Sequence, residues 1–373
     1  MRVIITGGGT AGHVYPGLAT ADKVKQLIPG TDILFVGTSK GLEAKIVPKA
    51  GYSFTSINIK GLKRKVSLDV FKTIFSFIAG CYRAIKIIKK FQPDVVLGTG
   101  GYVSAPMVAM AILLKIPTII HEQNSIPGLT NKLLGKRANI VAITFPCSEK
   151  FFKRDCIVTG NPIRKEILKA KREDALDFFS VESNRKTLLV FGGSQGSRCI
   201  NESLVDAYNR FRNFDNLQII HITGKIDFEK ISKQLEVQKR PQDKLLYNCY
   251  EYLNDIDKAY AVSDLVLCRA GATTIAEITA VGVPSILVPY PYSTGGHQEK
   301  NARVLEQEGA AKLILDEDMN GVAVFNSANE IIFNESILFK MRDNVSKLGK
   351  PNAALELAKL VKGLGEGRAR GGV

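Results

Sequence analysis

The sequence lacks the features that would build a metal centre, a disulfide framework or a membrane span. Its four histidines are scattered, and none of its six cysteines forms a Cys-x-x-Cys pair. We therefore expect no bound metal, no cofactor and reduced thiols of the cytosolic kind. No apolar run reaches the roughly 18 residues of a spanning helix. Nothing at the N-terminus resembles a signal peptide, because the chain opens directly into a buried-strand pattern.

Acidic residues are also in short supply. Asp and Glu number 36 against 51 Lys and Arg, which gives a net charge of +15. Such an excess fits an anionic partner: nucleic acid, a nucleotide substrate or an acidic membrane. A zinc finger, an RNA-recognition signature and aromatic–basic interleaving are all missing, so we expect no nucleic acid partner.

The pattern that is present is alternation of short apolar runs with helical segments over 373 residues. Runs apolar on both faces are typical of parallel strands covered by helices, so the predicted class is α/β with doubly wound parallel sheets. The length favours two domains, with a boundary near Gly160-Asn161-Pro162. The Gly/Arg-rich tail from Gly363 to Val373 is expected to be disordered. The expected strands are Val3–Thr6, Ile33–Val36, Val95–Leu97, Thr118–Ile120, Ile140–Ile143, Leu188–Phe191, Gln218–Ile222, Leu265–Leu267 and Ile286–Val288.

Three glycine-rich turns each follow one of these strands. A strand that enters a helix through glycines exposes backbone N–H groups to an anion. Such a turn is often only a tight bend, but two of these open separate halves of the chain, which suggests two nucleotide-binding-like halves facing one cleft. The turns are Gly7-Gly8-Gly9-Thr10-Ala11-Gly12-His13, Gly98-Thr99-Gly100-Gly101-Tyr102 and Gly192-Gly193-Ser194-Gln195-Gly196-Ser197.

The first turn formally matches the dinucleotide fingerprint G-x-G-x-x-G. That fingerprint also requires an acid at the end of the second strand, where this chain reads Val36-Gly37-Thr38. An oxidoreductase with a nicotinamide or flavin cofactor is therefore disfavoured. A catalytically silent protein that binds a sugar nucleotide stays open as an alternative.

Several polar residues stand where α/β enzymes carry their sites. His13 closes the first turn and is a candidate base, or else a helix cap. His121-Glu122-Gln123-Asn124 follows a strand, and is otherwise an ordinary polar loop. Glu277 lies in a predicted helix, where a carboxylate can accept two hydrogen bonds from a ribose diol or can simply be solvated. Gln298 offers an amide at a helix start.

Together these blocks resemble the MurG family, bacterial transferases that move N-acetylglucosamine from UDP-N-acetylglucosamine (UDP-GlcNAc) to lipid I. The likeness runs in order along almost the whole chain. It includes the His-Glu-Gln-Asn block at 121–124 and the Gly-Gly-Ser-Gln-Gly block at 192–196, which are specific in combination. Further matches are 8–19, 97–104, 160–164 and 268–272, with His297, Gln298, Asn301 and Ala302.

The resemblance implies a GT-B fold with two Rossmann-like domains. Residues 1–161 would form an acceptor and membrane-associating domain, joined by a returning helix at about 346–362, and residues 162–345 would bind UDP-GlcNAc. Inverting transfer to the 4-hydroxyl of the N-acetylmuramyl residue would make lipid II for peptidoglycan synthesis. A lipid glucosyltransferase of the same architecture is the closest rival.

The resemblance also implies site residues. His13 is the first candidate for the base and Glu122 the next. The donor would contact Thr10, Ala11, Gly12, Asn124, Arg164, Ser194, Leu253, Ala272, Thr273, Thr274, Ile275, Ala276, Glu277 and Gln298. The acceptor and diphosphate loops would be Gly100, Gly101, Tyr102 and Ser104 with Gly192, Gly193, Gln195 and Gly196. Leu253 and His297 stand where some relatives carry isoleucine and glutamine.

Residues 60–90 suggest how such an enzyme reaches a lipid acceptor. Basic residues there are nearly unopposed by acid, and an Ile/Phe-rich helical stripe lies among them. Part of that face is expected to meet an anionic membrane, which predicts a peripheral protein on the cytoplasmic side of the bacterial cell membrane. The alternative is a buried helix with a solvated basic flank. Proteins of cell-wall synthesis or division are further candidate partners. The basic residues are Lys60, Lys63, Arg64, Lys65, Lys72, Arg83, Lys86, Lys89 and Lys90; the stripe is Phe71, Phe75, Ile78, Tyr82 and Ile85, flanked by Val70, Ile74, Phe77 and Cys81.

Overall fold

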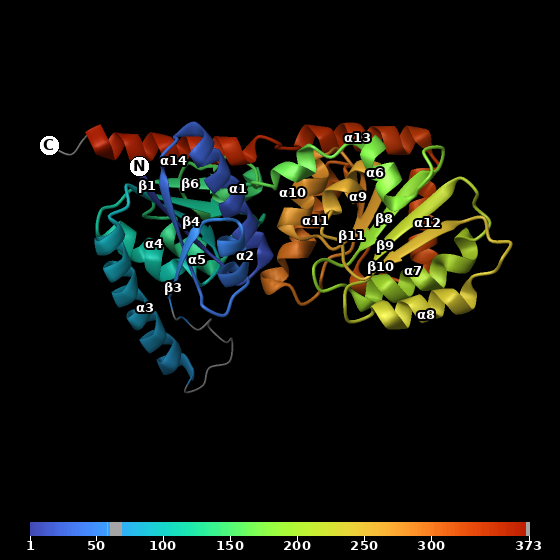
Figure 1. Ribbon diagram of the computed structural model, residues 1–373, viewed down its shortest axis with the longest axis horizontal. Helices are drawn as coiled ribbons and strands as arrows, with labels where there is room; N and C mark the ends of the chain where they lie inside the picture. Colours follow the sequence, from blue (N-terminus) through green and yellow to red (C-terminus); the bar gives the residue numbers. More distant parts are fainter. Residues whose placement is uncertain (58, 60–68, 371–373) are drawn as a thin grey trace. The chain divides into compact units, whose positions relative to one another are not determined.

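The protein divides into two compact units (Figure 1). The computed structural model describes residues 1–57, 59 and 69–370. Unit 1 comprises Met1–Arg164 and Pro351–Val373, and unit 2 comprises Lys165–Lys350. The first crossing between them thus falls a few residues beyond the expected boundary.

Unit 1 contains a parallel sheet in the order β3-β2-β1-β4-β5-β6-β7. The strands are β1 (Arg2–Gly7), β2 (Asp32–Gly37), β3 (Ser53–Ser56), β4 (Val95–Gly100), β5 (Thr118–Glu122), β6 (Ile140–Ile143) and β7 (Ile157–Val158). The order reverses between β1 and β4, so the loops after these two strands flank a switch point. In open α/β sheets, ligand sites form there, outside the carboxyl ends of the strands.

Side-chain alternation along β1 explains how this sheet is covered on both faces. Val3 and Ile5 pack with α1 (Ala11–Leu27) and α14 (Ala353–Arg370). Ile4 points to the other face, where it joins α3 (Asp69–Phe91) and α4 (Ser104–Leu113). Both faces are therefore apolar, as expected for a sheet with helices on either side. Two short helices complete the unit, α2 (Glu43–Lys49) and α5 (Leu129–Leu134).

Helix α14 brings the end of the chain back to unit 1 (Figure 1). It buries Leu357, Ala358 and Val361 in the same cluster as α1. The helix begins later than about residue 346 and extends to Arg370, so the expectation of a disordered tail from Gly363 is wrong for residues 363–370. Burial explains the difference, because Gly365 is buried beside the Met1 side chain and Leu364 packs against the same cluster.

Unit 2 repeats the plan with the strand order β10-β9-β8-β11-β12-β13, again parallel. Its switch point lies between β8 and β11. The strands are β8 (Lys186–Phe191), β9 (Leu217–Ile222), β10 (Leu246–Tyr250), β11 (Leu265–Cys268), β12 (Ser285–Leu287) and β13 (Ala311–Leu313). The helices are α6 (Arg172–Phe179), α7 (Arg198–Phe211), α8 (Phe228–Gln238), α9 (Ile256–Val262), α10 (Ala272–Ala280), α11 (His297–Gln307), α12 (Gly321–Ile332) and α13 (Glu335–Leu348).

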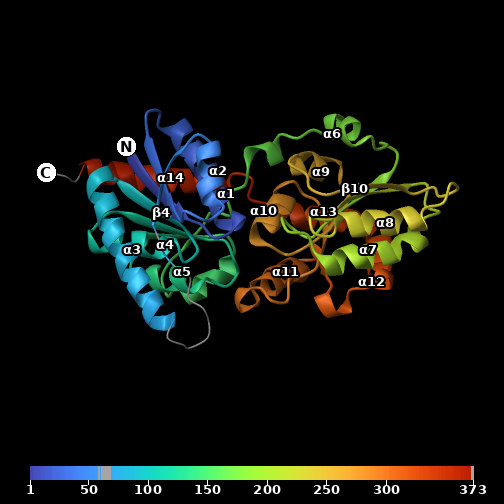
Figure 2. The same ribbon diagram turned by 60° about the horizontal axis from the view of Figure 1, so that its bottom comes forward.

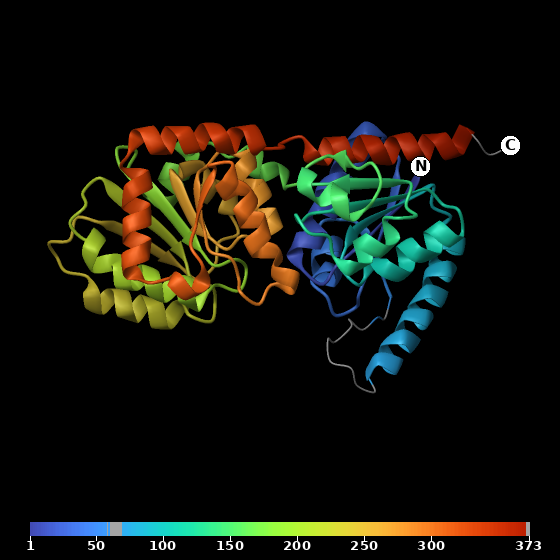
Figure 3. The same cartoon turned by 180° about the vertical axis from the view of Figure 1, so that it is seen from behind.

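Helices cover both faces of the second sheet as well: Leu188 and Val190 of β8 face α7, α8 and α12, and Phe191, on the opposite face, packs against Tyr260 of α9. In Figure 2, α7 and α8 lie side by side, and their residues Ile200, Leu204 and Ile231 enter one core cluster with β8 and β9. Figure 3 shows α12 and α13 from behind; Val324 and Leu338 belong to the same cluster. The doubly wound α/β class predicted from the sequence is confirmed for both units.

Candidate functional site

The switch point of unit 1 is bridged by a hydrogen bond from His13. This residue lies in the first turn of α1, and its Nδ1 is 3.0 Å from the carbonyl oxygen of Thr99 in β4. The Thr99 hydroxyl in turn donates to the carbonyl of His13 at 2.7 Å. The two residues therefore tie the glycine turn after β1 to the glycine turn after β4.

This contact fixes the chemistry of the imidazole. A carbonyl oxygen only accepts hydrogen bonds, so Nδ1 carries the ring proton and Nε2 keeps its lone pair. Burial lowers the pKa of His13, while the Thr99 carbonyl, the Gln123 side chain and the charge of Glu43 act in the opposite direction. The neutral ring is thus a base at physiological pH, with Nε2 as the accepting atom.

The glycines at 100 and 101 leave the space that this ring occupies. Both have left-handed backbone, with φ of +100° and +78°. A Cβ on Gly100 would lie 2.9 Å from His13 Nδ1, and one on Gly101 would lie 2.5 Å from the Gly8 carbonyl oxygen. The second glycine turn, expected to hold a diphosphate, thus also accommodates the imidazole.

Glu43 is a site residue that the sequence analysis missed. It is the first residue of α2, and its side chain is 1% exposed. One carboxylate oxygen accepts from the backbone and hydroxyl of Thr38, and the other accepts from the backbone N–H of Gly9 at 3.2 Å. An internal acid therefore binds an N–H group of the turn that the dinucleotide fingerprint would give to a phosphate.

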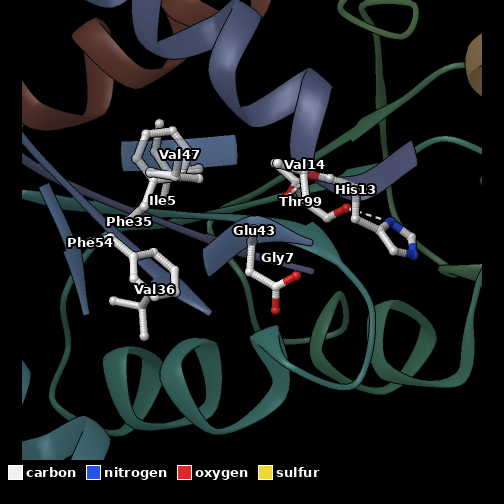
Figure 4. A pocket seen from close by; sticks show the side chains of 10 residues that line it. All are labelled: Ile5, Gly7, His13, Val14, Phe35, Val36, Glu43, Val47, Phe54 and Thr99. Carbon is white, nitrogen blue, oxygen red and sulfur yellow. Dashed lines mark hydrogen bonds between the residues drawn. The ribbon is translucent and has the colours of Figure 1, made fainter. Parts of the chain in front are cut away.

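Figure 4 shows that Glu43 and His13 line one small cavity beneath the first glycine turn. Its far end is apolar, while His13 and Thr99 close the other end. The negative charge of Glu43 is thereby held near the imidazole of His13. In the described part of the chain, no hydrogen bond joins these two side chains. The lining residues are Ile5, Gly7, His13, Val14, Phe35, Val36, Glu43, Val47, Phe54 and Thr99.

Glu122, the second candidate base, is buried at the end of β5. Its oxygens accept hydrogen bonds from the backbone and side chain of Asn124, the backbone of Gly128 and the side chain of Asn131, at 2.9–3.1 Å. Burial raises the pKa of Glu122, and these four donors oppose the rise. These hydrogen bonds order the loop that carries Asn124. They also occupy the two oxygens of Glu122 that a base would offer to an acceptor hydroxyl.

The other predicted residues of unit 1 lie around the same edge of the sheet. Thr10 precedes α1, with Ala11 and Gly12 in its first turn. Tyr102 is exposed beside the second glycine turn, and the Ser104 hydroxyl closes that turn by donating to the Gly101 carbonyl at 2.9 Å. Arg164, at the end of the unit's first segment, stacks over the ring of Tyr15 at 5.0 Å.

The third glycine turn lies at the switch point of unit 2, between β8 and α7. Gly192 packs against the backbone of Ser197, and Gly196 packs against Gly224 and the Thr223 carbonyl after β9. These approaches exclude side chains at both glycines. Ser194 and Gln195, in the middle of the turn, are exposed. Gly193 has left-handed backbone, with a φ of +89°.

Arg269 is a second residue whose role the sequence did not indicate. It follows β11 and donates to the Ser197 hydroxyl at 2.7 Å, to the carbonyls of Val288 and Pro289, and to the carboxylate of Asp316. The buried guanidinium thus joins the loops after β8, β12 and β13. Its charge is paired with that of Asp316, so Arg269 acts on the glycine turn through its hydrogen bond to Ser197.

The predicted ribose ligand, Glu277, is 5% exposed in α10. Its Oε2 accepts a hydrogen bond from Tyr260 at 3.0 Å. The same helix begins with Ala272, Thr273 and Thr274 at the edge of the sheet next to Gly271, followed by Ile275 and Ala276. Tyr260 therefore orients the Glu277 carboxylate, which comes from the second turn of α10.

Gln298 and Leu253 complete the edge of the second sheet. Gln298 Oε1 accepts from the backbone N–H of Tyr290 at 2.9 Å, and this contact fixes the orientation of its side-chain NH₂ group. Leu253 is half-buried in the loop between β10 and α9. The predicted residues thus fall on the carboxyl edges of the two sheets, each described within its own unit.

Two features bear on metal and membrane. Within the described ranges, no group of three or more His, Cys, Asp and Glu side chains is gathered as metal ligands would be. No helix in the described part of the chain is both long and apolar enough to cross a bilayer.

Two doubly wound parallel sheets, each with a glycine turn at its switch point, are the architecture of the GT-B fold. The model of the glycosyltransferase family 28 N-terminal domain matches residues 3–143, and that of the C-terminal domain matches residues 187–357. The chain therefore belongs to glycosyltransferase family 28 and, within it, to the MurG group.

Individual relatives agree with this assignment. A protein of Desulforamulus reducens is 44% identical over 97% of this chain and 98% of its own length. One of Halothermothrix orenii is 43% identical over 98% of this chain and 100% of its own. Both are named UDP-N-acetylglucosamine--N-acetylmuramyl-(pentapeptide) pyrophosphoryl-undecaprenol N-acetylglucosamine transferase. The crystal structure of Acinetobacter baumannii MurG matches with a TM-score of 0.80 at 28% identity, over 97% of this chain and 99% of that one.

Proposed function

We propose that the chain transfers N-acetylglucosamine from UDP-GlcNAc to lipid I and so makes lipid II. The names of relatives that match nearly end to end at 43–44% identity support this activity. The site supports the same reaction, because it offers a neutral imidazole base in unit 1 and a glycine turn suited to phosphate in unit 2.

The reaction is an inverting displacement. The 4-hydroxyl oxygen of the N-acetylmuramyl residue attacks the anomeric carbon as the bond from that carbon to the diphosphate oxygen breaks. The hydroxyl proton passes to Nε2 of His13, and UDP leaves with the bonding electron pair. The observation that carries this role is the 3.0 Å contact from His13 Nδ1 to the Thr99 carbonyl, which leaves Nε2 as the acceptor.

In this proposal unit 2 binds the donor. Backbone N–H groups of the turn at Gly192–Gly196, with the N-terminus of α7, stabilise the departing diphosphate. The Leu253 backbone meets uracil, Glu277 the ribose diol, and residues 272–276 line the nucleotide. Thr10–Gly12, Asn124, Arg164 and Gln298 contact the donor sugar or its phosphates, and no metal ion is required.

Unit 1 is proposed to rest on the cytoplasmic leaflet. On α3, the side chains of Phe75, Ile78 and Tyr82 are 78%, 59% and 62% exposed. If α3 were a buried domain helix, these apolar side chains would be covered. The opposite side of α3 packs inward through Gly80, Ala84 and Ile88. Exposed Arg83, Lys86, Lys89 and Lys90 flank the apolar stripe, so anionic headgroups and acyl chains are both accommodated. Lys60, Lys63, Arg64 and Lys65 lie outside the described residues, as do the side chains of Val70, Phe71, Lys72 and Ile74.

Transfer of radiolabelled sugar tests the activity. The purified chain is incubated with lipid I and UDP-GlcNAc, beside parallel reactions with UDP-glucose and with diacylglycerol. We expect labelled product only from UDP-GlcNAc with lipid I. Transfer of glucose to diacylglycerol would instead identify a lipid glucosyltransferase. Tight UDP-GlcNAc binding without turnover would identify a catalytically silent protein that binds a sugar nucleotide.

A further inference from the structure

A chain of buried polar groups extends from His13 into the sheet of unit 1. Gln123, the first residue after β5, is 2% exposed. Its Nε2 lies 2.6 Å from the Thr99 carbonyl oxygen and 3.1 Å from His121 Nδ1. A carbonyl oxygen can only accept, so the amide nitrogen must face Thr99, and the same NH₂ group supplies the hydrogen bond to His121.

His121 is held in one tautomer by both of its ring nitrogens. Its Nε2 is 2.9 Å from the Gly160 carbonyl oxygen and therefore carries the proton, while Nδ1 accepts from Gln123. Burial lowers the pKa of His121 to about 4; the Gly160 carbonyl opposes this effect and the neighbouring His13 adds to it. The ring thus stays neutral at physiological pH, as its acceptor role at Nδ1 requires.

The proton positions along the chain are consequently set from its two carbonyl groups. The Gly160 carbonyl fixes the tautomer of His121. His121 and the Thr99 carbonyl then fix the orientation of the Gln123 amide, and the Thr99 carbonyl accepts from both Gln123 and His13. Glu43, across the small cavity, is the further charged group that acts on the His13 ring. Because residues 100 and 101 are glycines, the imidazole of His13 packs directly against the backbone of this turn.

We propose that Gln123 and His121 are positioning residues that hold the Thr99 carbonyl and thereby keep His13 with its proton on Nδ1 and its lone pair on Nε2. The catalytic meaning of this arrangement rests on the proposed function, in which Nε2 takes the acceptor proton. The arrangement itself is measurable without turnover. His13 and His121 hold opposite tautomers, Nδ1–H and Nε2–H respectively.

The first experiment reads the tautomers directly. The full chain has four histidines, His13, His121, His221 and His297, so ring-¹⁵N labelling gives a small set of signals that single variants assign. Spectra are taken at roughly pH 8, above the ordinary histidine pKa of about 6.5. We expect the nitrogen shifts of Nδ1–H for His13 and of Nε2–H for His121. An Nε2–H tautomer at His13 would overturn the proposal whatever the activity.

Gln123→Met tests the link, because methionine fills a similar space without an amide. We expect the single His13 tautomer to become a mixture and kcat to fall about 10–100-fold, the scale of a misplaced catalytic group. The KM for UDP-GlcNAc should change less than about twofold, since Gln123 is not a proposed donor ligand. The acid limb of the kcat profile should move to lower pH, because Gln123 helps to raise the pKa of His13.

Gln218→Met is the matched control in unit 2. Gln218 is also a fully buried bridging amide, which donates to the Glu182 carbonyl and the Thr187 hydroxyl at 2.9 and 2.8 Å. It should lower stability without changing the His13 tautomer or the acid limb. His221, held by Asn201 and Tyr247, reports on the folding of that unit.

The outcomes separate this inference from the proposed function. A folded Gln123→Met protein with an unchanged His13 tautomer and unchanged kcat would refute the positioning role. If that variant fails to fold, the wild-type tautomers decide the question. If the tautomers are as stated but His13→Ala keeps full activity, the role of His13 as base fails while the hydrogen-bonded chain stands.

Discussion

The carboxylate of Glu43 accepts the backbone N–H of Gly9 at 3.2 Å, so the first glycine turn is held by an acid of the same chain. The other oxygen of Glu43 binds Thr38 at the end of β2. The turn that carries His13 is therefore braced from the neighbouring strand. One N–H group that the dinucleotide fingerprint would give to a phosphate is thus bound by Glu43 instead.

The first prediction concerns Glu43→Gln, which removes the charge and keeps one acceptor oxygen. Activity falls as pH drops through the pKa of His13, because a protonated ring cannot accept the hydroxyl proton. The negative charge of Glu43 raises that pKa, so its removal should lower it. We expect the acid limb of the kcat profile to shift to lower pH.

Glu43→Ala serves as the comparison and leaves the Gly9 and Thr38 donors without their acceptor. The free energy of unfolding should drop by about 1.5–3 kcal/mol, as for a lost hydrogen bond to a charged group. Denaturant titration measures it. If the acid limb of the kcat profile does not move in Glu43→Gln, the charge of Glu43 does not affect the pKa of His13.

The second prediction concerns donor binding through Glu277. Glu277→Ala should weaken UDP binding by about 1–3 kcal/mol, the range for a charge-assisted hydrogen bond. Tyr260→Phe removes the phenol that orients Glu277 and should give a smaller loss. Calorimetry with UDP measures both, with circular dichroism to verify the fold. Undiminished affinity in a folded Glu277→Ala protein would remove this carboxylate from the donor site.

The third prediction concerns His13→Ala. If Nε2 takes the acceptor proton, kcat should fall roughly 10²–10⁴-fold, the usual contribution of a general base. Calorimetric affinity for UDP should change far less, because the donor contacts are proposed to lie mainly in unit 2. A loss below about fivefold at saturating lipid I would reassign His13 to shaping the glycine turns.

The interior of both sheets could be predicted from sequence, whereas their edges could not. All nine expected strands form, and the strands that were missed, β3, β7, β10 and β13, are the four edge strands. An interior strand is apolar on both faces and stands out as a continuous run. An edge strand such as Ser53–Ser56 is polar and partly exposed, so its sequence resembles a loop.

The site shows the same division between local and tertiary signals. The glycine turns and the His-Glu-Gln-Asn block follow predicted strands, so their place at the carboxyl edges followed from the topology rule. Glu43 and Arg269 could not be found in this way. Each acts through backbone groups of loops far away in sequence, a relationship that appears only once the strands are ordered.

The fourth prediction concerns metal. Activity should survive EDTA, because backbone N–H groups and a helix terminus are proposed to meet the charge of the departing diphosphate. Transfer is measured after dialysis against chelator, with and without added magnesium or manganese. Complete loss of transfer that either ion restores would contradict this mechanism, whereas a weak stimulation would leave it intact.

The last prediction concerns the membrane surface on α3. Each basic residue near an anionic surface contributes about 1 kcal/mol, so Arg83, Lys86, Lys89 and Lys90 together suffice for measurable binding. The screening length is about 8 Å at physiological ionic strength, so this part should weaken with salt. Burial of Phe75 and its apolar neighbours should leave a salt-resistant remainder. Binding to phosphatidylglycerol vesicles should therefore fall with salt without vanishing.

Two substitutions separate these contributions in the vesicle assay. Phe75→Ser should reduce the salt-resistant part, whereas Phe339→Ser should not: Phe339 is 75% exposed, close to the 78% of Phe75, but lies on α13 in unit 2. Replacing Lys86, Lys89 and Lys90 by Ala should reduce only the salt-sensitive part. Equal binding to phosphatidylcholine and phosphatidylglycerol vesicles, or equal losses in both Phe variants, would show that α3 is not the contact surface. In that case lipid I alone would have to recruit the enzyme.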